Sequence, residues 1–295
     1  MAAKKATKDV PAPDYGDLAG YDVLMVNGSI DDSLFAKIVA TVAKNKGSDK
    51  LVLAIVTYGG LANAGFRIGR LLQSMYGDIV VFVPSFCKSA GTLVAMSGNK
   101  LVLSAFGEIG PLDVQLAERD EIGERKSGLT MRSALEDLSE RSFELFSEFM
   151  INIKRSSGNN ISFKLAAELA KDVTTGLMSN VYSQIHPDVL GKDYRDLSVA
   201  TKYGQRLNKK FGNISDAGIR CLVHDYPSHD FVIDYDEAAE IFQRVELPAN
   251  PLMELAQRNN LMVPKINGSV VKMEHWPVPE SEENDETGVS KNVSS

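Results

Sequence analysis

Short apolar runs alternate with helical patterns along the first hundred residues, and this order limits the possible folds more than any other feature. The runs have the composition of buried strands, and they cover residues 21–30, 51–56, 79–83 and 100–104. Between them, apolar residues recur at the spacing of amphipathic helices. Strands and helices that alternate with short connections form βαβ units with right-handed crossovers. The sequence therefore predicts an α/β fold with a mostly parallel sheet.

Glycine-rich turns follow three of these expected strands. Gly59 and Gly60 come after the strand 51–56, the segment 84–92 follows the next strand, and residues 107–111 follow the strand after that. In parallel sheets the carboxyl ends of the strands lie at one edge, where binding and catalytic sites form. We expect the three turns to converge on one site.

Ser89 stands at a strand-to-helix turn within the segment 84–92. A serine placed there projects its hydroxyl from a fixed backbone, next to the free N–H groups of a helix N-terminus. Acyl-transfer chemistry requires such an arrangement. Ser89 also fits the common role of a helix N-cap, and these residues alone leave both roles open. Cys87, in the same segment, is expected to be a small buried side chain.

Helical patterns are expected to predominate after residue 115. Residues 129–154 predict a long amphipathic helix. Shorter helical patterns cover 161–172, 176–186, 196–211 and 236–245. An apolar run at 219–223 precedes a polar loop at 224–230.

Four regions are expected along the chain. Residues 1–18 are predicted to be a flexible arm, 19–247 the main domain and 248–276 a C-terminal extension. Residues 277–295 form an acidic tail with too few apolar residues to fold.

Composition excludes several classes of function. The net charge of −7 does not favour nucleic acid. No segment approaches the roughly 20 apolar residues that span a membrane, and the N-terminus lacks the apolar core of a signal peptide. Two cysteines cannot form a disulfide framework. No metal-ligand spacing or phosphate-binding loop is present, so no metal, cofactor or ATP is expected. We expect a soluble, cytoplasmic protein.

Four motifs occur in the order of a known family. They are residues 57–60 (Thr-Tyr-Gly-Gly), 88–92 (Lys-Ser-Ala-Gly-Thr), 107–115 and 226–233. Together they resemble the Clp/crotonase-fold serine peptidases, and the closest branch looks like the serine dehydrogenase proteinase family, akin to signal peptide peptidase A. The resemblance extends from about residue 20 to 247. It implies a Clp/crotonase-like ββα superhelix with an added helical region.

The resemblance assigns roles to three residues. Ser89 corresponds to the nucleophile, and the backbone N–H groups of Gly60 and Ala90 correspond to the donors of an oxyanion hole. Each such donor contributes on the order of 3 kcal/mol to transition-state stabilisation. Glycine at positions 59 and 60 suits this role, because no Cβ blocks the substrate or forbids a positive φ.

The sequence identifies the general base less clearly than the nucleophile. In the Clp pattern a histidine follows the glycine-rich turn, but here Asp113 stands at that position. A carboxylate is a weak base for a serine unless burial raises its pKa. Asp230 falls where the pattern places its acid, and His229 is adjacent to it. Our hypothesis is that His229 acts as the base, oriented by Asp113 or Asp230.

A lysine base is the alternative, because signal peptide peptidase A uses one. Lys88 adjoins Ser89 in sequence, so its side chain is expected to point away from the hydroxyl. Lys126 and Lys154 flank the region from which a related branch draws its lysine.

These features predict a soluble, ATP-independent serine peptidase that acts on peptides or unfolded protein through an acyl-enzyme on Ser89. A non-catalytic scaffold is one alternative, since the expected histidine is absent at position 113. A crotonase-type acyl-CoA enzyme is another, because that chemistry also uses an oxyanion hole. Related folds assemble into closed rings, and the helix at 129–154, rich in Phe and Met, offers an interface. We therefore expect a homo-oligomer.

Overall fold

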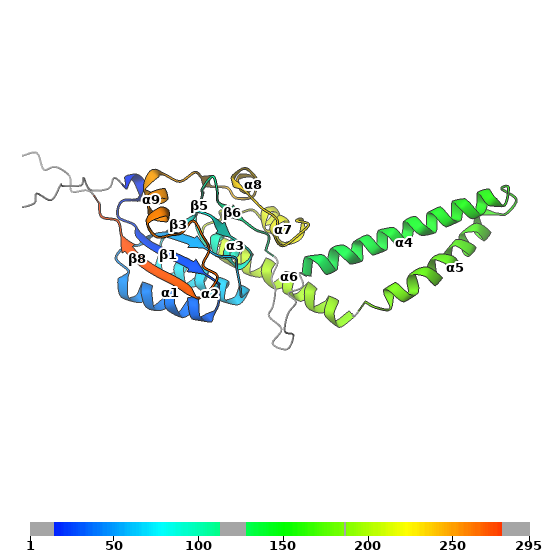
Figure 1. The fold of residues 1–295 in the computed structure, drawn as a ribbon, viewed down its shortest axis with the longest axis horizontal. Helices are drawn as coiled ribbons and strands as arrows, with labels where there is room; N and C mark the ends of the chain where they lie inside the picture. The colour runs from blue at the N-terminus through cyan, green and yellow to red at the C-terminus, as the bar shows by residue number, and fades with distance from the viewer. Residues whose placement is uncertain (1–14, 113–127, 186, 279–295) are drawn as a thin grey trace, which may run out of the picture.

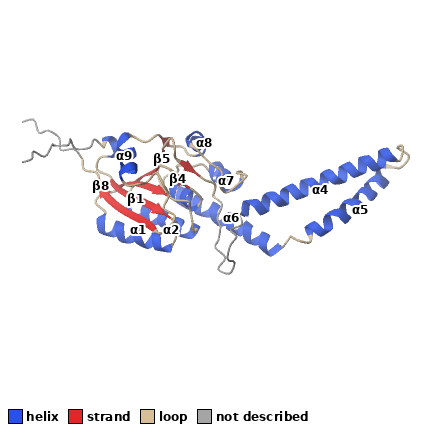
Figure 2. Ribbon diagram, viewed as in Figure 1, coloured by secondary structure: helices blue, strands red, loops and turns tan. Residues whose placement is uncertain are grey.

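The protein is built around a six-stranded sheet, shown in a computed structural model that describes residues 15–112, 128–185 and 187–278 (Figures 1 and 2). The strand order is β7-β5-β3-β2-β1-β8, and every neighbouring pair is parallel except β1 with β8. The strands are β1 (Asp22–Gly28), β2 (Lys50–Val56), β3 (Asp78–Val83), β5 (Lys100–Leu103), β7 (Val245–Glu246) and β8 (Ser269–His275). The predicted α/β fold with a mostly parallel sheet is confirmed.

Helices cover both faces of this sheet, and the alternation of side chains along the strands explains why. In β2, Leu51, Leu53 and Ile55 pack on the face covered by α1 (Asp32–Asn45), α2 (Ala62–Met75) and α3 (Ala90–Ala95). The intervening side chains pack on the other face, under α9 (Asn250–Arg258). A strand that is buried on both faces consists of a continuous run of apolar residues, so these strands can be predicted from the sequence.

The helical half of the chain contains a projecting arm. The helices of this half of the chain are α4 (Gly128–Ser156), α5 (Phe163–Tyr182), α6 (Pro187–Asn208), α7 (Asp216–His224) and α8 (Tyr235–Ile241). In Figure 1, α4 and α5 form an antiparallel hairpin that extends away from the sheet, and α6 returns to it. The patterns expected at 161–172 and 176–186 correspond mainly to one continuous helix, α5, because Gly176 is accommodated in its middle. The apolar run at 219–223 lies within α7.

The C-terminal extension contributes to the sheet. β8 pairs antiparallel with β1 along its whole length, from Asp22 opposite His275 to Gly28 opposite Ser269. Trp276, only 1% exposed, stacks on Tyr15 with 4.5 Å between the ring centroids. This edge strand is not predicted from the sequence, because its half-exposed Val, Lys and Glu residues lack a continuous apolar run.

None of the helices within the described residues has the length and apolar character needed to cross a membrane.

Candidate active site

The loops at the carboxyl ends of the strands lie side by side and are joined by short bridges. Gly60, after β2, pairs with Ile30, after β1, and Thr57 pairs with Cys87. β4 (Phe86–Cys87), after β3, pairs in parallel with β6 (Glu108–Ile109), after β5. The expectation that the three glycine-rich turns converge is therefore confirmed.

Ser89 has the most unusual backbone conformation in this row of loops. Its φ is 53° and its ψ is −117°, and its side chain is buried. The other non-glycine residues with positive φ in the described chain, Asn159 and Asn260, are of a type that tolerates it. A conformation of this kind costs about 1–3 kcal/mol and persists only where the surrounding structure holds it. Ser89 occupies the N-cap position of α3, but its side chain makes no capping hydrogen bond. The N-cap role is therefore not what the hydroxyl performs.

Gly59 and Gly60 lie directly against this turn. A Cβ on Gly59, whose φ is 102°, would lie 2.8 Å from both the Ser89 Cβ and the Lys88 carbonyl oxygen. A Cβ on Gly60, whose φ is 145°, would collide with the carbonyl oxygen of Ile30. Only glycine lets the two turns approach this closely.

Two backbone N–H groups at this contact are available. In the Ile30–Gly60 bridge the hydrogen bonds run from Ile30 N–H to the Gly59 carbonyl and from Leu61 N–H to the Ile30 carbonyl. The Gly60 N–H takes no part in the bridge and so points away from Ile30. Neither it nor the Ala90 N–H donates a hydrogen bond to another described residue. The Ala90 nitrogen is 3.3 Å from the Cβ position of Gly59, so the Ser89 turn lies against the Gly-Gly turn at this point.

The Lys88 side chain points into the protein, away from solvent. Its Nζ lies 2.9 Å from Glu108 Oε1 and donates a hydrogen bond of 3.1 Å to the Phe231 carbonyl oxygen. The Lys88 side chain is 10% exposed and that of Glu108 18%. This pair ties the Ser89 turn to β6 and to the loop that carries His229. A lysine held in this way is unsuitable as the base, as expected from its place in the sequence.

The loop containing His229 and Asp230 is attached to the same row. Ile233 and Ile109 exchange two backbone hydrogen bonds, of 2.9 and 3.1 Å. His229 is half-buried, whereas Asp230 is exposed. The structure therefore places the segment of His229 against the segments that hold Ser89.

The remaining residues predicted from the sequence are Asp113, Lys126, Lys154 and Cys87. Asp113 and Lys126 lie outside the described residues. Lys154 lies in the last turn of α4, where its Nζ donates to the carbonyls of Asn159 and Ile161. It connects the two helices of the hairpin and does not belong to the site. Cys87 is fully buried, and burial raises the pKa of its thiol, in keeping with the expected structural role.

Sequence reasoning missed two polar residues that organise the site. Glu108 holds Lys88, and the Thr57 hydroxyl accepts a hydrogen bond of 2.9 Å from the Gly59 N–H. Thr57 could have been found from its place just before the Gly-Gly pair. Glu108 carries a weaker signal, since a single acidic residue in a glycine-rich turn is usually solvated.

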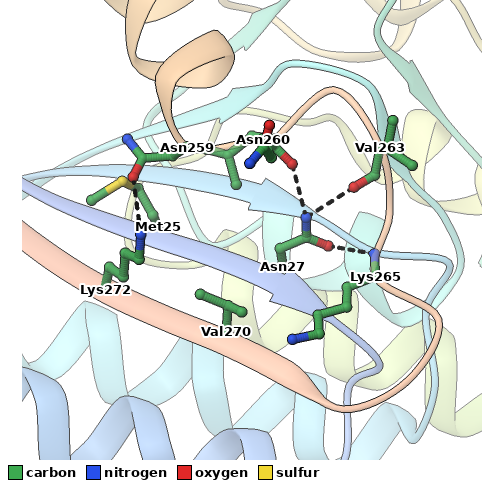
Figure 3. Close-up of a pocket in the computed structure, with 9 residues that line it drawn as sticks. Met25, Asn27, Asn259, Asn260, Val263, Lys265, Val270 and Lys272 are labelled. Atoms are coloured by element: carbon green, nitrogen blue, oxygen red, sulfur yellow. Dashed lines mark hydrogen bonds between the residues drawn. The ribbon is translucent and has the colours of Figure 1, made fainter.

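A cavity of about 400 Å³ lies outside this row of loops, between β1, β8 and the loop after α9 (Figure 3). The Asn27 side chain holds that loop: its Nδ2 donates to the Val263 carbonyl (2.9 Å), and its Oδ1 accepts from the Lys265 N–H (2.7 Å). Met25 and Val270 contribute apolar lining, and Lys265 and Lys272 add two amines. None of the residues predicted for the site lines this cavity.

A family model described as ClpP-like SDH-type serine proteinase matches residues 25–202, more than half of the chain. Two uncharacterized proteins of Methanocaldococcus jannaschii are similar: MJ1495 is 26% identical over 139 residues and MJ0137 is 25% identical over 161. These matches cover 44% and 52% of this chain, and 46% and 54% of the relatives, so they span about half the length of each relative.

Solved structures are also similar to this chain over part of its length. One is a mutant of the 1510-N membrane-bound stomatin-specific protease, at 16% identity and a TM-score of 0.32, covering 52% of this chain and 70% of that one. A second mutant of that protease, in complex with a substrate peptide, is 19% identical with a TM-score of 0.31, covering 51% and 64%.

Replacing Gly59 tests whether the close approach of the two turns sustains the Ser89 conformation. We expect Gly59→Ala to lower the free energy of unfolding by at least about 2 kcal/mol, because it combines a positive φ with a collision against Ser89. Urea denaturation followed by circular dichroism measures this change. Gly191→Ala is the control, since the nearest atom to its Cβ would be 3.8 Å away. Equal stability of the two variants would contradict the proposed contact.

A second prediction concerns the buried Lys88–Glu108 pair. Lys88→Met leaves a buried carboxylate unpaired and is expected to destabilise the protein by about 3–5 kcal/mol. The double variant Lys88→Met, Glu108→Leu should recover most of this loss. The exposed Lys100–Glu246 pair, with the same 2.9 Å separation, is the matched control, and Lys100→Met should cost less than about 1 kcal/mol. If both lysine variants lose the same stability, the pair does not hold the turn.

Proposed function

Because this chain belongs to the family of ClpP-like SDH-type serine proteinases, we propose that it is a soluble serine peptidase that cleaves peptides or unfolded protein without ATP. The observation that carries the proposal is the Ser89 turn, held in a strained conformation against Gly59 and Gly60. Backbone strain at a serine between a strand and a helix is characteristic of nucleophiles that must project their hydroxyl.

The proposed reaction uses Ser89 as the nucleophile. Its Oγ attacks the carbonyl carbon of the scissile bond while a base removes the hydroxyl proton. The N–H groups of Gly60 and Ala90 stabilise the oxyanion of the tetrahedral intermediate. The intermediate collapses to an ester on Ser89, and the base returns its proton to the departing amine. Water then hydrolyses the ester by the same route and regenerates the serine.

We propose His229 as the base, with Asp113 or Asp230 orienting its imidazole. Two contacts support this assignment: the Lys88 ammonium donates to the carbonyl of Phe231, two residues beyond His229, and Ile233 pairs with Ile109. Both attach the loop of His229 to segments that flank Ser89. Lys126 is the alternative base, by resemblance to the branch that uses lysine.

We also propose that the protein is a homo-oligomer. The support comes from the arm, where large apolar side chains of α4 and α5 are exposed, including Phe143 (71%) and Leu177 (55%). A helix must bury its apolar side against another element, and a hairpin of two helices cannot bury all of it.

Removing the Ser89 hydroxyl tests the proposed nucleophile. Ser89→Ala should lower hydrolysis of a fluorescein-labelled unfolded protein by at least about 1000-fold, because no acyl-enzyme can form. Ser85→Ala is the matched control: it removes a hydroxyl from the same loop, one that donates to the Leu261 carbonyl. This control should lose only the small contribution of one neutral hydrogen bond. Unchanged hydrolysis by Ser89→Ala would exclude the peptidase mechanism and favour a scaffold.

The identity of the base is tested by the rate at which a fluorophosphonate probe labels Ser89. His229→Ala should slow labelling by about 100-fold or more, because general-base catalysis contributes about 10²–10⁴ to such steps. His224→Ala, at the end of α7, is the control and should label at the wild-type rate. Full labelling of His229→Ala, together with loss of labelling in Lys126→Ala, would assign the role to the lysine.

A further inference from the structure

Thr92 is the last residue of the motif 88–92, and the proposed mechanism gives it no role. It lies in the first turn of α3 and is fully buried, at 0% exposure. Burying a hydroxyl is unfavourable unless it is hydrogen-bonded, and a valine of similar shape would fill this space without that cost. The hydrogen bonds of Thr92 therefore indicate what the residue does.

The Thr92 hydroxyl connects the Ser89 turn with the turn that follows β6. Its Oγ1 donates toward the carbonyl oxygens of Cys87 (3.0 Å) and Gly110 (2.7 Å), and it accepts from the Gly110 N–H (3.2 Å). A hydroxyl has one proton and two lone pairs, so the two carbonyls share the proton. β4 and β6 are only two residues long, and this hydroxyl continues their connection beyond the last paired residues.

The peptide group between Cys87 and Lys88 is consequently held on both sides. Its carbonyl accepts from Thr92, and its N–H donates to the Thr57 carbonyl oxygen (3.0 Å). The chain therefore enters Ser89 from a fixed direction. A residue with a strained backbone keeps its conformation only where its surroundings hold it, and Thr92 is part of what holds the φ of 53° at Ser89.

The start of α3 also differs from an ordinary capping box. Ser89 is the N-cap, so Thr92 is the third residue of the helix. In a capping box the N-cap side chain bonds to the N–H of this third residue, whose own side chain reaches back to the N-cap. Ser89 makes no such bond, and the Thr92 side chain reaches past it to Cys87. The hydroxyl that anchors this turn is thus that of Thr92.

We infer that Thr92 is a positioning residue for the proposed nucleophile: its hydroxyl holds the Ser89 turn in its strained conformation and joins it to the turn after β6. The inference rests on the proposed peptidase function of Ser89. A reacting group displaced by about 1 Å loses on the order of 100-fold in rate. Loss of the Thr92 hydroxyl should therefore slow the attack by Ser89 without weakening the binding of substrate.

The rate at which a fluorophosphonate probe labels Ser89 tests this role. Thr92→Val keeps the approximate shape of the side chain, removes the hydroxyl and should slow labelling by about 10-fold or more. Thr92→Ser keeps the hydroxyl and should label at close to the wild-type rate. Thr174→Val is the matched control, since Thr174 in α5 is also buried and its hydroxyl has no hydrogen-bond partner among the described residues. This control should label at the wild-type rate.

Steady-state hydrolysis of a fluorogenic peptide gives a readout that a loss of stability alone would not move. Thr92→Val should lower kcat and kcat/KM by the same factor and leave KM unchanged, because only the approach to the transition state is affected. Circular dichroism at the assay temperature confirms that each variant is folded.

Amide hydrogen exchange followed by mass spectrometry tests the hold on the two turns without any chemistry at Ser89. Peptides that cover residues 84–92 and 107–112 should exchange faster in Thr92→Val than in the wild type, because both segments lose an anchor. Exchange in the rest of the described chain should be unchanged.

The outcomes separate this inference from the proposed function. Wild-type labelling by Thr92→Val, or equal slowing by Thr92→Val and Thr92→Ser, would overturn the positioning role and leave Ser89 as the proposed nucleophile. A raised KM at unchanged kcat would also overturn it, as would unchanged exchange at 84–92 and 107–112. A wild type that does not react with the probe would refute the proposed function, and the positioning role would fall with it.

Discussion

The close approach of Gly59 to the Ser89 turn is the constraint on which the rest of the site depends. A single Cβ at position 59 would fall within 2.8 Å of Ser89, so the two turns meet backbone to backbone. This contact brings the Gly-Gly turn against the Ser89 turn and holds Ser89 at a φ that an L-residue rarely adopts. The chemistry that we propose for the site thus depends on the absence of a side chain at position 59 as much as on the serine hydroxyl.

The sheet, the bridges between the loops and one buried ion pair together hold this contact in place. The parallel sheet brings the carboxyl ends of β1, β2, β3 and β5 to one edge, and bridges between the following loops fix their spacing. Beneath them, the Lys88–Glu108 pair connects the Ser89 turn to the loop of His229. A buried ion pair contributes little net stability by itself, but breaking it leaves a charge without a partner. We propose that this pair favours the observed arrangement of the three segments over alternatives.

The sequence predicted the strands and turns whose formation depends on residues close together in the chain. Runs such as 51–56 and 79–83 are apolar throughout because both faces of their strands are buried, and the glycines at 59 and 60 mark a turn without a Cβ. The edge strand β8 was missed because its burial depends on β1, more than 200 residues earlier. Glu108 was missed for the same reason, since its partner is known only once β4 and β6 pair. The exposed apolar residues of α5, such as Leu169 and Leu177, illustrate a related limit. They fit an amphipathic helix, and only the position of α4 shows that they are exposed.

The most direct test of the central claim is a crystal structure of the protein with a peptide boronic acid, which mimics the tetrahedral intermediate. We predict a covalent bond from Ser89 Oγ to boron, with one boronate oxygen about 2.7–3.1 Å from the backbone nitrogens of both Gly60 and Ala90. A boronate that is bonded to Ser89 but directs no oxygen at these nitrogens would refute the oxyanion hole. An unmodified Ser89 at saturating boronic acid would refute the nucleophile.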